Sequence, residues 1–159
     1  MNIDIIAVGK LKEQYLRNAV EEYTKRLSWY CTLSVFEVKD EMAPADPSPG
    51  EREKILQAEG ARISKYIKEV SYIIALDIKG EQVSSEAFAG RLQDLMLKGN
   101  SRLIFIIGGS LGLHPSILTS ANWRLSFSKM TFPHQLMRVI LCEQLYRSFT
   151  ILKGEPYHK

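Results

Sequence analysis

The sequence predicts an α/β fold with a mostly parallel sheet and helices on both faces of that sheet. Short segments rich in β-branched residues alternate along the chain with longer segments of helical period. Two of the short segments, 72–76 and 103–107, are apolar at nearly every position. Such runs are typical of central strands that helices cover on both sides.

The first half of the chain contains two predicted strands and two predicted helices. Ile3–Val8 and Thr32–Val38 have strand composition, and the segment from Lys12 to about Trp29 has helical period. Three prolines make Ala43–Gly50 a loop, because proline fixes φ and removes a donor. A charged helix is expected from Glu51 to Lys68. The expected inward residues are Tyr15, Ala19, Tyr23 and Leu27 in the first helix, and Ile55, Ala58, Ile63, Tyr66 and Ile67 in the second.

The second half continues this alternation. After the strand at 72–76, we expect a turn at Lys79–Glu81 and a helix that Ser84 or Ser85 caps. That helix is expected to end at Gly99. The remaining elements are a strand at 103–107, a short helix near Pro115, a strand at Trp123–Phe127, and a long helix that Pro133 starts and Gly154 ends.

Bulk properties are those of an ordinary globular protein, with 45% hydrophobic and 25% charged residues. The 159 residues suit a single domain, 1–159. No apolar run approaches the roughly 20 residues of a membrane helix, and the N-terminal apolar stretch lacks the basic segment of a secretory signal. Cys31 and Cys142 match no zinc or redox spacing. We therefore expect reduced, buried thiols, no metal, no membrane association and a cytoplasmic location.

Positive charge is concentrated in the last part of the chain. Arg124–Lys159 contains six basic residues and two acidic ones, whereas the whole chain has a formal charge of +3. Such a region can attract a polyanion such as RNA, or it can be a solvated cationic face.

Three loops are expected at the carboxyl edge of the sheet, where parallel sheets bind ligands. They follow Leu76, contain Gly108-Gly109, and span Ser126–Phe132. The glycines at 108, 109 and 112 match neither the G-x-G-x-x-G dinucleotide motif nor a P-loop. The double glycine therefore either lets a ligand approach the backbone closely or simply makes a tight turn.

The Ser126–Phe132 loop combines aromatic, thioether and hydroxyl groups within seven residues. Phe127, Met130 and Phe132 either line an apolar slot for a planar heterocycle or pack the loop onto the core.

The last helix is apolar on nearly all sides, so it is expected to be buried on two sides. In a domain of this size, the second side suggests another copy of the chain. Glu143 and Arg147 are four residues apart in the order that favours a local salt bridge.

Ionisable groups of this last third are candidates for chemistry. His134 and Arg138 lie four apart, and because like charges repel, we expect His134 to be neutral at neutral pH. It is then either a proton acceptor or an ordinary histidine near a helix N-terminus. His114 has no nearby ionisable partner and is expected to be structural. The tail at Tyr157-His158-Lys159 either frays or folds over a site.

Several motifs match one known family. They are Val8-Gly9-Lys10, Leu16–Leu27, Phe105–Gly112, Leu125–His134, the helix from Arg138 to Arg147, and the tail Gly154–His158. With these motifs the chain resembles the ribosomal RNA large subunit methyltransferase H family over essentially its whole length. Met42–Gly50 is the least similar segment.

The resemblance implies a SPOUT methyltransferase fold whose C-terminal part forms a trefoil knot, which fold-level rules alone would reject. It implies S-adenosylmethionine as cofactor and a homodimer with the site at the subunit interface. It also implies methylation of N3 of a pseudouridine in helix 69 of 23S ribosomal RNA, on the assembled ribosome. The cofactor-binding residues carried over by position are Leu76, Gly108, Gly109, Phe127, Ser128, Lys129, Met130, Thr131 and Phe132.

The implied reaction requires N3 to lose a proton, so a base or a cation near the reacting nitrogen would help. The candidate catalytic residues are His134, Arg138, Tyr157 and His158, the last two reaching across the dimer. The candidates for holding RNA phosphates are Lys10, Lys12, Arg17, Lys129 and Lys159. Two alternatives stay open: a knotted methyltransferase acting on transfer RNA, and a ribosome-binding factor that does not bind the cofactor.

Overall fold

The computed structural model describes residues 1–159 and contains a five-stranded sheet in which all paired strands are parallel. The strand order is β2-β1-β4-β3-β5. The strands are β1 Asn2–Val8, β2 Thr32–Val38, β3 Tyr72–Gln82, β4 Arg102–Ile107 and β5 Trp123–Ser126. The predicted α/β class with a parallel sheet is confirmed.

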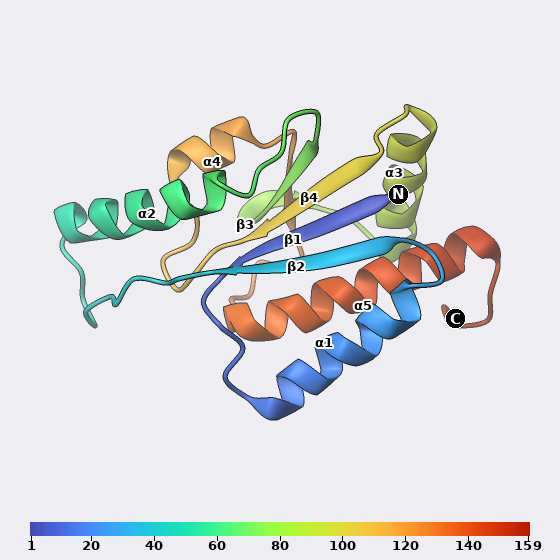
Figure 1. Ribbon diagram of the computed structural model, residues 1–159, viewed down its shortest axis with the longest axis horizontal. Helices are drawn as coiled ribbons and strands as arrows, with labels where there is room; N and C mark the ends of the chain where they lie inside the picture. Colours follow the sequence, from blue (N-terminus) through green and yellow to red (C-terminus); the bar gives the residue numbers. More distant parts are fainter.

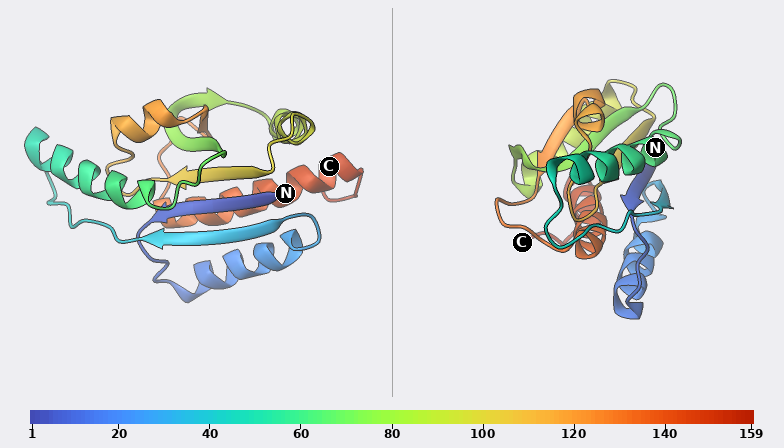
Figure 2. Two further views of the ribbon diagram at one scale, coloured as in Figure 1. Left: turned by 45° about the horizontal axis from the view of Figure 1, so that its top comes forward. Right: turned by 90° about the vertical axis from the view of Figure 1, so that its left-hand side faces the viewer.

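Helices cover both faces of this sheet, as predicted (Figures 1 and 2). They are α1 Gln14–Leu27, α2 Pro49–Ser64, α3 Ser85–Leu97, α4 Pro115–Ser120 and α5 His134–Lys153. One core joins α1, α3 and α5 to the strand residues Ile5 and Phe105, and a second core joins α2 and α4 to Ile6 and Ile106. Because side chains alternate along a strand, neighbouring residues of β1 and β4 serve opposite cores.

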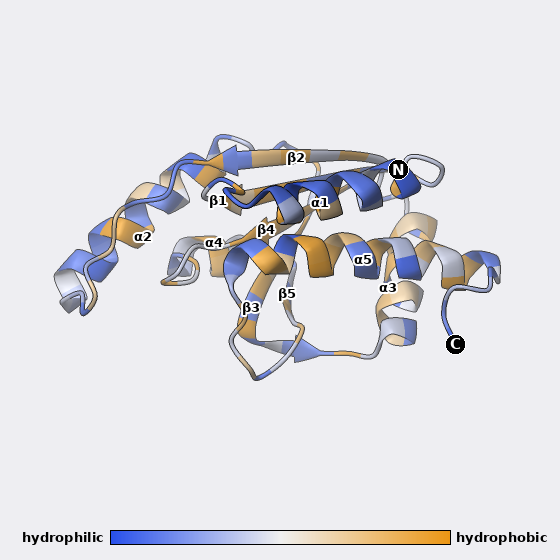
Figure 3. Ribbon diagram, turned by 90° about the horizontal axis from the view of Figure 1, so that it is seen from below, coloured by the Kyte–Doolittle hydropathy of each residue, from blue (hydrophilic) through white to orange (hydrophobic).

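The helix α5 runs along the sheet between α1 and α3. Seen from this face, α1 presents a largely hydrophilic outer side, whereas α5 carries hydrophobic residues among hydrophilic ones (Figure 3). The neighbouring helices of the same chain therefore account for part of the unusually apolar character of α5. Gly154 ends the helix with φ of 67°, in the left-handed conformation that favours glycine.

The turn predicted at Lys79–Glu81 is wrong, because β3 continues through it to Gln82. The pairing of β3 with β5 shifts between Leu76 and Glu81, so the intervening residues bulge from the sheet. Asp77 at the start of this bulge is paired with Arg124 of β5. A Cβ atom on Gly80 would lie only 2.6 Å from the Arg124 carbonyl oxygen, so a glycine is needed where the bulge closes.

The inward faces of α1 and α2 differ in part from those predicted. Leu27 is buried and Tyr23 packs against the core, as predicted, but Tyr15 is exposed. The other buried positions of α1 are Leu16 and Val20, because these aliphatic residues also follow the helical period. Tyr66 lies beyond the end of α2, whose buried residues are Ile55, Leu56, Glu59, Gly60 and Ile63.

Capping residues set two of the helix starts. Ser48 and Glu51 form a capping box, so α2 begins at Pro49, inside the segment predicted to be a loop. The side chain of Ser84, one of the two predicted caps, accepts the Ala87 backbone N–H at the start of α3.

Cys31 and Cys142 are free and buried, as predicted. Burial raises the pKa of the Cys31 thiol to about 11 and that of Cys142 to about 12, which makes both thiols unreactive at neutral pH. None of the helices is sufficiently long and apolar to cross a lipid bilayer.

Candidate functional site

A cavity of about 690 Å³ opens at the carboxyl edge of the sheet. Its walls are the bulge of β3, the loop after β4, the loop after β5 and the first turn of α5. The lining residues are Leu76, Asp77, Ile78, Ile107, Gly108, Gly109, Ser110, Leu111, Gly112, Leu113, Leu118, Leu125, Ser126, Phe127, Ser128, Met130, Thr131, Phe132, Pro133, His134 and Met137. The volume lies within the range of roughly 300–1,000 Å³ for small-molecule sites.

The strand order explains why these loops converge. β4, β3 and β5 are neighbours in the sheet, and the carboxyl ends of parallel strands meet at one edge. The loop after β4 folds back on itself, since Gly112 N–H donates to the Gly109 carbonyl at 3.1 Å. A Cβ atom on Gly108 would lie 2.5 Å from the Gly112 carbonyl oxygen. The double glycine therefore makes a tight turn and also exposes its backbone to the cavity.

The loop after β5 is ordered by its own hydroxyl groups. Ser126 Oγ donates to the Ser128 carbonyl at 3.0 Å, and Met130 N–H donates to Ser128 Oγ at 2.9 Å. Phe127 packs against the core residue Phe88, with the ring centroids 6.4 Å apart. Met130 is exposed, as is Phe132 to a smaller extent. Both interpretations hold for Phe127, which packs against the core and lines the cavity, while Met130 and Phe132 line the cavity and are exposed.

Eight of the nine residues expected to bind a cofactor line this cavity. The exception is Lys129, which is exposed and outside the lining. The lining contains one carboxyl group, Asp77, and one imidazole, His134, but no lysine or arginine.

His134 lies in the cavity wall and is half-buried. Burial and then the positive charge of Arg138 lower the pKa of its imidazole, and the carboxylate of Asp40 opposes them. The predicted neutral imidazole agrees with this direction. Burial is the larger cause, which the i,i+4 spacing alone did not reveal.

Arg138 does not share the cavity with His134. Its side chain is only 1% exposed and points to the ends of β1 and β2. It donates from Nη1 to Glu37 Oε2 at 2.6 Å and from Nη2 to the carbonyls of Val8, at 3.0 Å, and Gly9. The guanidinium therefore links α5 by hydrogen bonds to β2 and to the end of β1 within the same chain.

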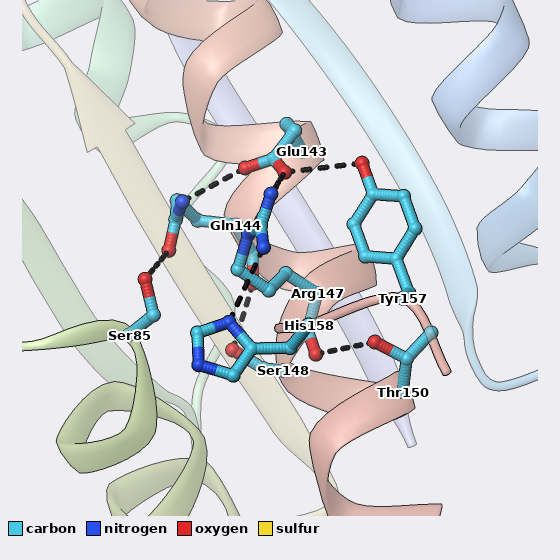
Figure 4. A network of polar contacts seen from close by, with 8 residues as sticks. All are labelled: Ser85, Glu143, Gln144, Arg147, Ser148, Thr150, Tyr157 and His158. Carbon is cyan, nitrogen blue, oxygen red and sulfur yellow. Dashed lines mark hydrogen bonds and ion pairs between the residues drawn. The ribbon is translucent and has the colours of Figure 1, made fainter. Parts of the chain in front are cut away.

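Tyr157 and His158 lie at the other end of α5 (Figure 4). Tyr157 Oη donates to Glu143 Oε1 at 3.1 Å, and burial raises the pKa of this phenol. His158 contacts Arg147 Nη1 at 3.2 Å through Nδ1 and Glu86 Oε1 at 2.8 Å through Nε2. The tail is thus folded onto α5 and α3 and is not frayed.

One chain does not bring this tail to the cavity. α5 has 20 residues and is therefore about 30 Å long, with His134 at its start and the tail at its end. Both chain termini lie at the end of the sheet away from the cavity (Figures 1 and 2). The structure therefore places only His134, of the four candidate catalytic residues, in the wall of this cavity.

The polar network around the tail includes the predicted salt bridge. Arg147 donates to Glu143 Oε1 from Nε at 2.9 Å and from Nη2 at 2.5 Å, which confirms the i,i+4 pair. Gln144 extends the network to α3, because Ser85 Oγ donates to Gln144 Oε1 at 2.7 Å (Figure 4).

His114 has the structural role predicted, although it does have an ionisable partner. Its Nδ1 accepts the Ser116 backbone N–H and so caps α4, while Nε2 lies 3.0 Å from Glu53 Oε1. The expectation of no such partner is wrong because Glu53 comes from α2, 61 residues earlier in the chain.

The residues predicted to hold RNA phosphates differ in whether their side chains already have hydrogen-bond partners in the protein. Lys10, Lys12, Lys129 and Lys159 are exposed. Arg17 instead donates to the backbone carbonyls of Leu11 and Lys12 and to Gln14, which holds the segment before α1.

The sequence alone did not single out Asp77 as a lining residue. The signal that could have identified Asp77 is its place directly after the apolar strand 72–76. Because that strand is predicted to end at the carboxyl edge of the sheet, a charged residue there is expected to lie near a ligand. Asp77 Oδ2 accepts a hydrogen bond from Arg124 Nε at 2.9 Å, and Oδ1 accepts one from Lys79 N–H at 3.2 Å. Asp77 therefore shapes the wall that presents Leu76 and Ile78 to the cavity.

The family model and the most similar curated proteins indicate the same family. A family model described as predicted SPOUT methyltransferase matches residues 1–158. Ribosomal RNA large subunit methyltransferase H of Clostridium kluyveri is 57% identical over 159 residues, which is 100% of each chain. The protein of the same name from Clostridium botulinum is 56% identical over the same coverage.

A solved structure supports the fold independently. A probable methylase family protein from Haemophilus influenzae aligns with 99% of this chain and 70% of its own, with a TM-score of 0.56 and 11% identity. On the full-length family match and the close relatives, the chain belongs to the SPOUT methyltransferases and, within them, to the ribosomal RNA large subunit methyltransferase H family.

Proposed function

We propose that this protein transfers a methyl group from S-adenosylmethionine to N3 of a pseudouridine in helix 69 of 23S ribosomal RNA. The substrate is the assembled ribosome, and the reaction takes place in the cytoplasm. Family membership supports the general reaction. The resemblance of the sequence motifs supports the finer choice of base, atom and substrate.

The observation that carries the proposal is the cavity at the carboxyl edge of the sheet. Its volume, its apolar wall and the tight glycine turn fit a nucleoside with a short amino-acid arm. The absence of lysine and arginine from the lining fits a sulfonium cation. When bound, this cofactor supplies an activated methyl group. The protein mainly has to align the nucleophile with it and exclude competing water.

Leu76, Gly108, Gly109, and the Phe127–Phe132 loop would hold the cofactor, with Lys129 reaching outward to RNA. His134, neutral and in the wall, is our choice for the group that accepts the N3 proton. Geometry makes Arg138 a support for α5, because Glu37 and two backbone carbonyls already engage its guanidinium.

The tail contributes to the site only if a second copy of the chain is present. In the proposed homodimer, Tyr157 and His158 of one protomer approach the cavity of the other. Exposed apolar side chains beside the cavity, namely Met130, Phe132 and Leu136, support such a contact at the start of α5. The resemblance implies a trefoil knot in the C-terminal part of the chain. Such a knot would involve the loops after β4 and β5 and the helix α5, which all contribute residues to the cavity wall.

The direct test is methyl transfer from labelled S-adenosylmethionine to four substrates: 70S ribosomes, isolated 50S subunits, naked 23S RNA and transfer RNA. Label should enter assembled ribosomes, and mass spectrometry should locate one added methyl on N3 of a pseudouridine in helix 69. Label in transfer RNA alone would favour the alternative knotted enzyme. Flat calorimetric titrations with the cofactor, with and without ribosomes, would contradict the enzyme and favour a binding factor.

A further inference from the structure

Two ionisable side chains lie close to Gly9, beside the cavity. A Cβ atom placed on Gly9 would lie 3.6 Å from His134 Nε2 and 3.8 Å from Asp40 Cγ. Both groups are therefore within van der Waals distance of the same point. The imidazole comes from the first turn of α5, and the carboxylate comes from the segment after β2. Gly9 has φ of 85°, so its backbone also disfavours any larger residue between them.

Asp40 is exposed, yet the backbone on each side of it is anchored. Arg62 Nη1 donates to the Lys39 carbonyl at 2.8 Å, and the Glu41 N–H donates to Glu59 Oε1 at 3.0 Å. Both anchors belong to α2, and Glu59 is only 4% exposed. The position of Asp40 is thus set by a helix, although a loop with three prolines follows it directly.

The charged groups around His134 come from several elements. Arg138 follows on α5, and Glu37 of β2 is paired with that guanidinium. Asp77 of the β3 bulge is paired with Arg124, and Lys10 after β1 is exposed to solvent. Asp40 is the one carboxylate that raises the pKa of the His134 imidazole, against burial and the Arg138 charge.

We propose that Asp40 acts through His134 and that its negative charge stabilises the imidazolium formed during methyl transfer. This inference depends on the proposed function, in which His134 accepts a proton. In that step N3 loses its proton to the His134 imidazole and bonds to the methyl carbon. The bond from this carbon to sulfur breaks, and its electron pair stays on sulfur. A carboxylate beside an imidazole favours the protonated form that results.

The test compares Asp40→Asn with Asp46→Asn, which makes the same charge change at an exposed position further along the same segment. In the protein without ligands, NMR should show a lower titration midpoint for His134 in Asp40→Asn and an unchanged one in Asp46→Asn. His134→Gln assigns the resonance. With ribosomes, Asp40→Asn should lower kcat by about three- to tenfold and move the acid limb of the pH profile downward. The KM for cofactor should stay within a factor of about two.

An unchanged midpoint of His134 in Asp40→Asn would overturn the inference, whatever the activity. If the midpoint shifts but the unmodified protein methylates no RNA, the proposed function fails while the electrostatic effect of Asp40 on His134 stands. The two failures are therefore distinguishable.

The anchor on α2 is tested separately. Glu59→Gln keeps an oxygen that accepts the Glu41 N–H, whereas Glu59→Ala removes it. We expect Glu59→Gln to keep the wild-type midpoint of His134 and Glu59→Ala to move it in the direction of Asp40→Asn. Equal midpoints in both variants would contradict a positioning role for α2.

Discussion

The Asp77 carboxylate of β3 is held by the Arg124 guanidinium of β5, and this pair closes the bulge that forms one wall of the cavity. The two residues are 47 positions apart in the chain. Because Gly80 lies directly on the Arg124 backbone, the bulge is fixed at both of its ends.

Arg124→Ala should therefore weaken cofactor binding without unfolding the protein. The Arg124 side chain is 45% exposed, so the loss is expected to be about 1 kcal/mol, or roughly fivefold in Kd. Calorimetric titration with S-adenosylmethionine measures it. Arg52→Ala, on the exposed side of α2, is the control and should bind normally. Equal affinity in the two variants would show that the bulge does not shape the site.

Gly108→Ala should impair both folding stability and cofactor binding. Its Cβ would lie 2.5 Å from the Gly112 carbonyl oxygen, so the turn has to open at a cost of about 1–3 kcal/mol. Affinity for the cofactor should fall more than tenfold. Gly90→Ala is the matched control, since that Cβ meets nothing within 4 Å and lies inside α3. This change should stabilise the protein by about 0.5–1 kcal/mol in urea denaturation.

The location of the cavity could be predicted from sequence because it follows from a general property of parallel sheets. Leu76, Gly108 and the Ser126–Phe132 loop each end a predicted strand, and the carboxyl ends of such strands share an edge. The cavity lining bears out that convergence. The fold class followed equally from the alternation of short apolar and long amphipathic segments.

The parts that could not be predicted depend on pairs of residues far apart in the chain. The bulge of β3 depends on the ion pair between Asp77 and Arg124, and the position of the His114 side chain depends on its contact with Glu53. Local periodicity carries no information on such pairs until the strand order is known. The folded tail is a similar case, because its position depends on Glu86 of α3.

Arg138→Met should destabilise the protein, since the change leaves two backbone carbonyls and Glu37 without their donor. Removing one partner from a buried polar cluster is expected to cost about 2–3 kcal/mol here. Urea denaturation measures the difference. Arg26→Met, which removes an exposed salt bridge on α1, should leave the midpoint almost unchanged. An Arg138→Met protein that is fully stable but inactive would indicate a catalytic role instead.

Acidification should weaken the contact between α3 and the C-terminal tail. Hydrogen bonds from its own backbone N–H, from His158 and from Ser84 lower the pKa of Glu86 to about 2. A depressed carboxyl pKa adds stability that is present above the unfolded value of 4.5 and is lost as the pH falls toward 2. Protection factors of the amides of residues 154–159, corrected for the intrinsic exchange rate at each pH, should therefore fall over that interval. Glu86→Ala, which removes the partner of His158 Nε2, should show low protection already at pH 7, and wild-type protection in that variant would contradict the contact with His158.

The buried carboxyl of Glu59 should make stability depend on pH in the opposite sense. Burial is the main cause that raises the pKa of Glu59 above its ordinary value of 4.5. A raised pKa means that the contribution to stability is complete below the unfolded value and is lost as the pH rises through the folded value. Glu59→Gln stays neutral and can still accept the Glu41 N–H. The Tm of this variant, relative to wild type, should therefore be higher at pH 8 than at pH 4. A difference in Tm that does not change with pH would show that Glu59 ionises freely in the folded protein.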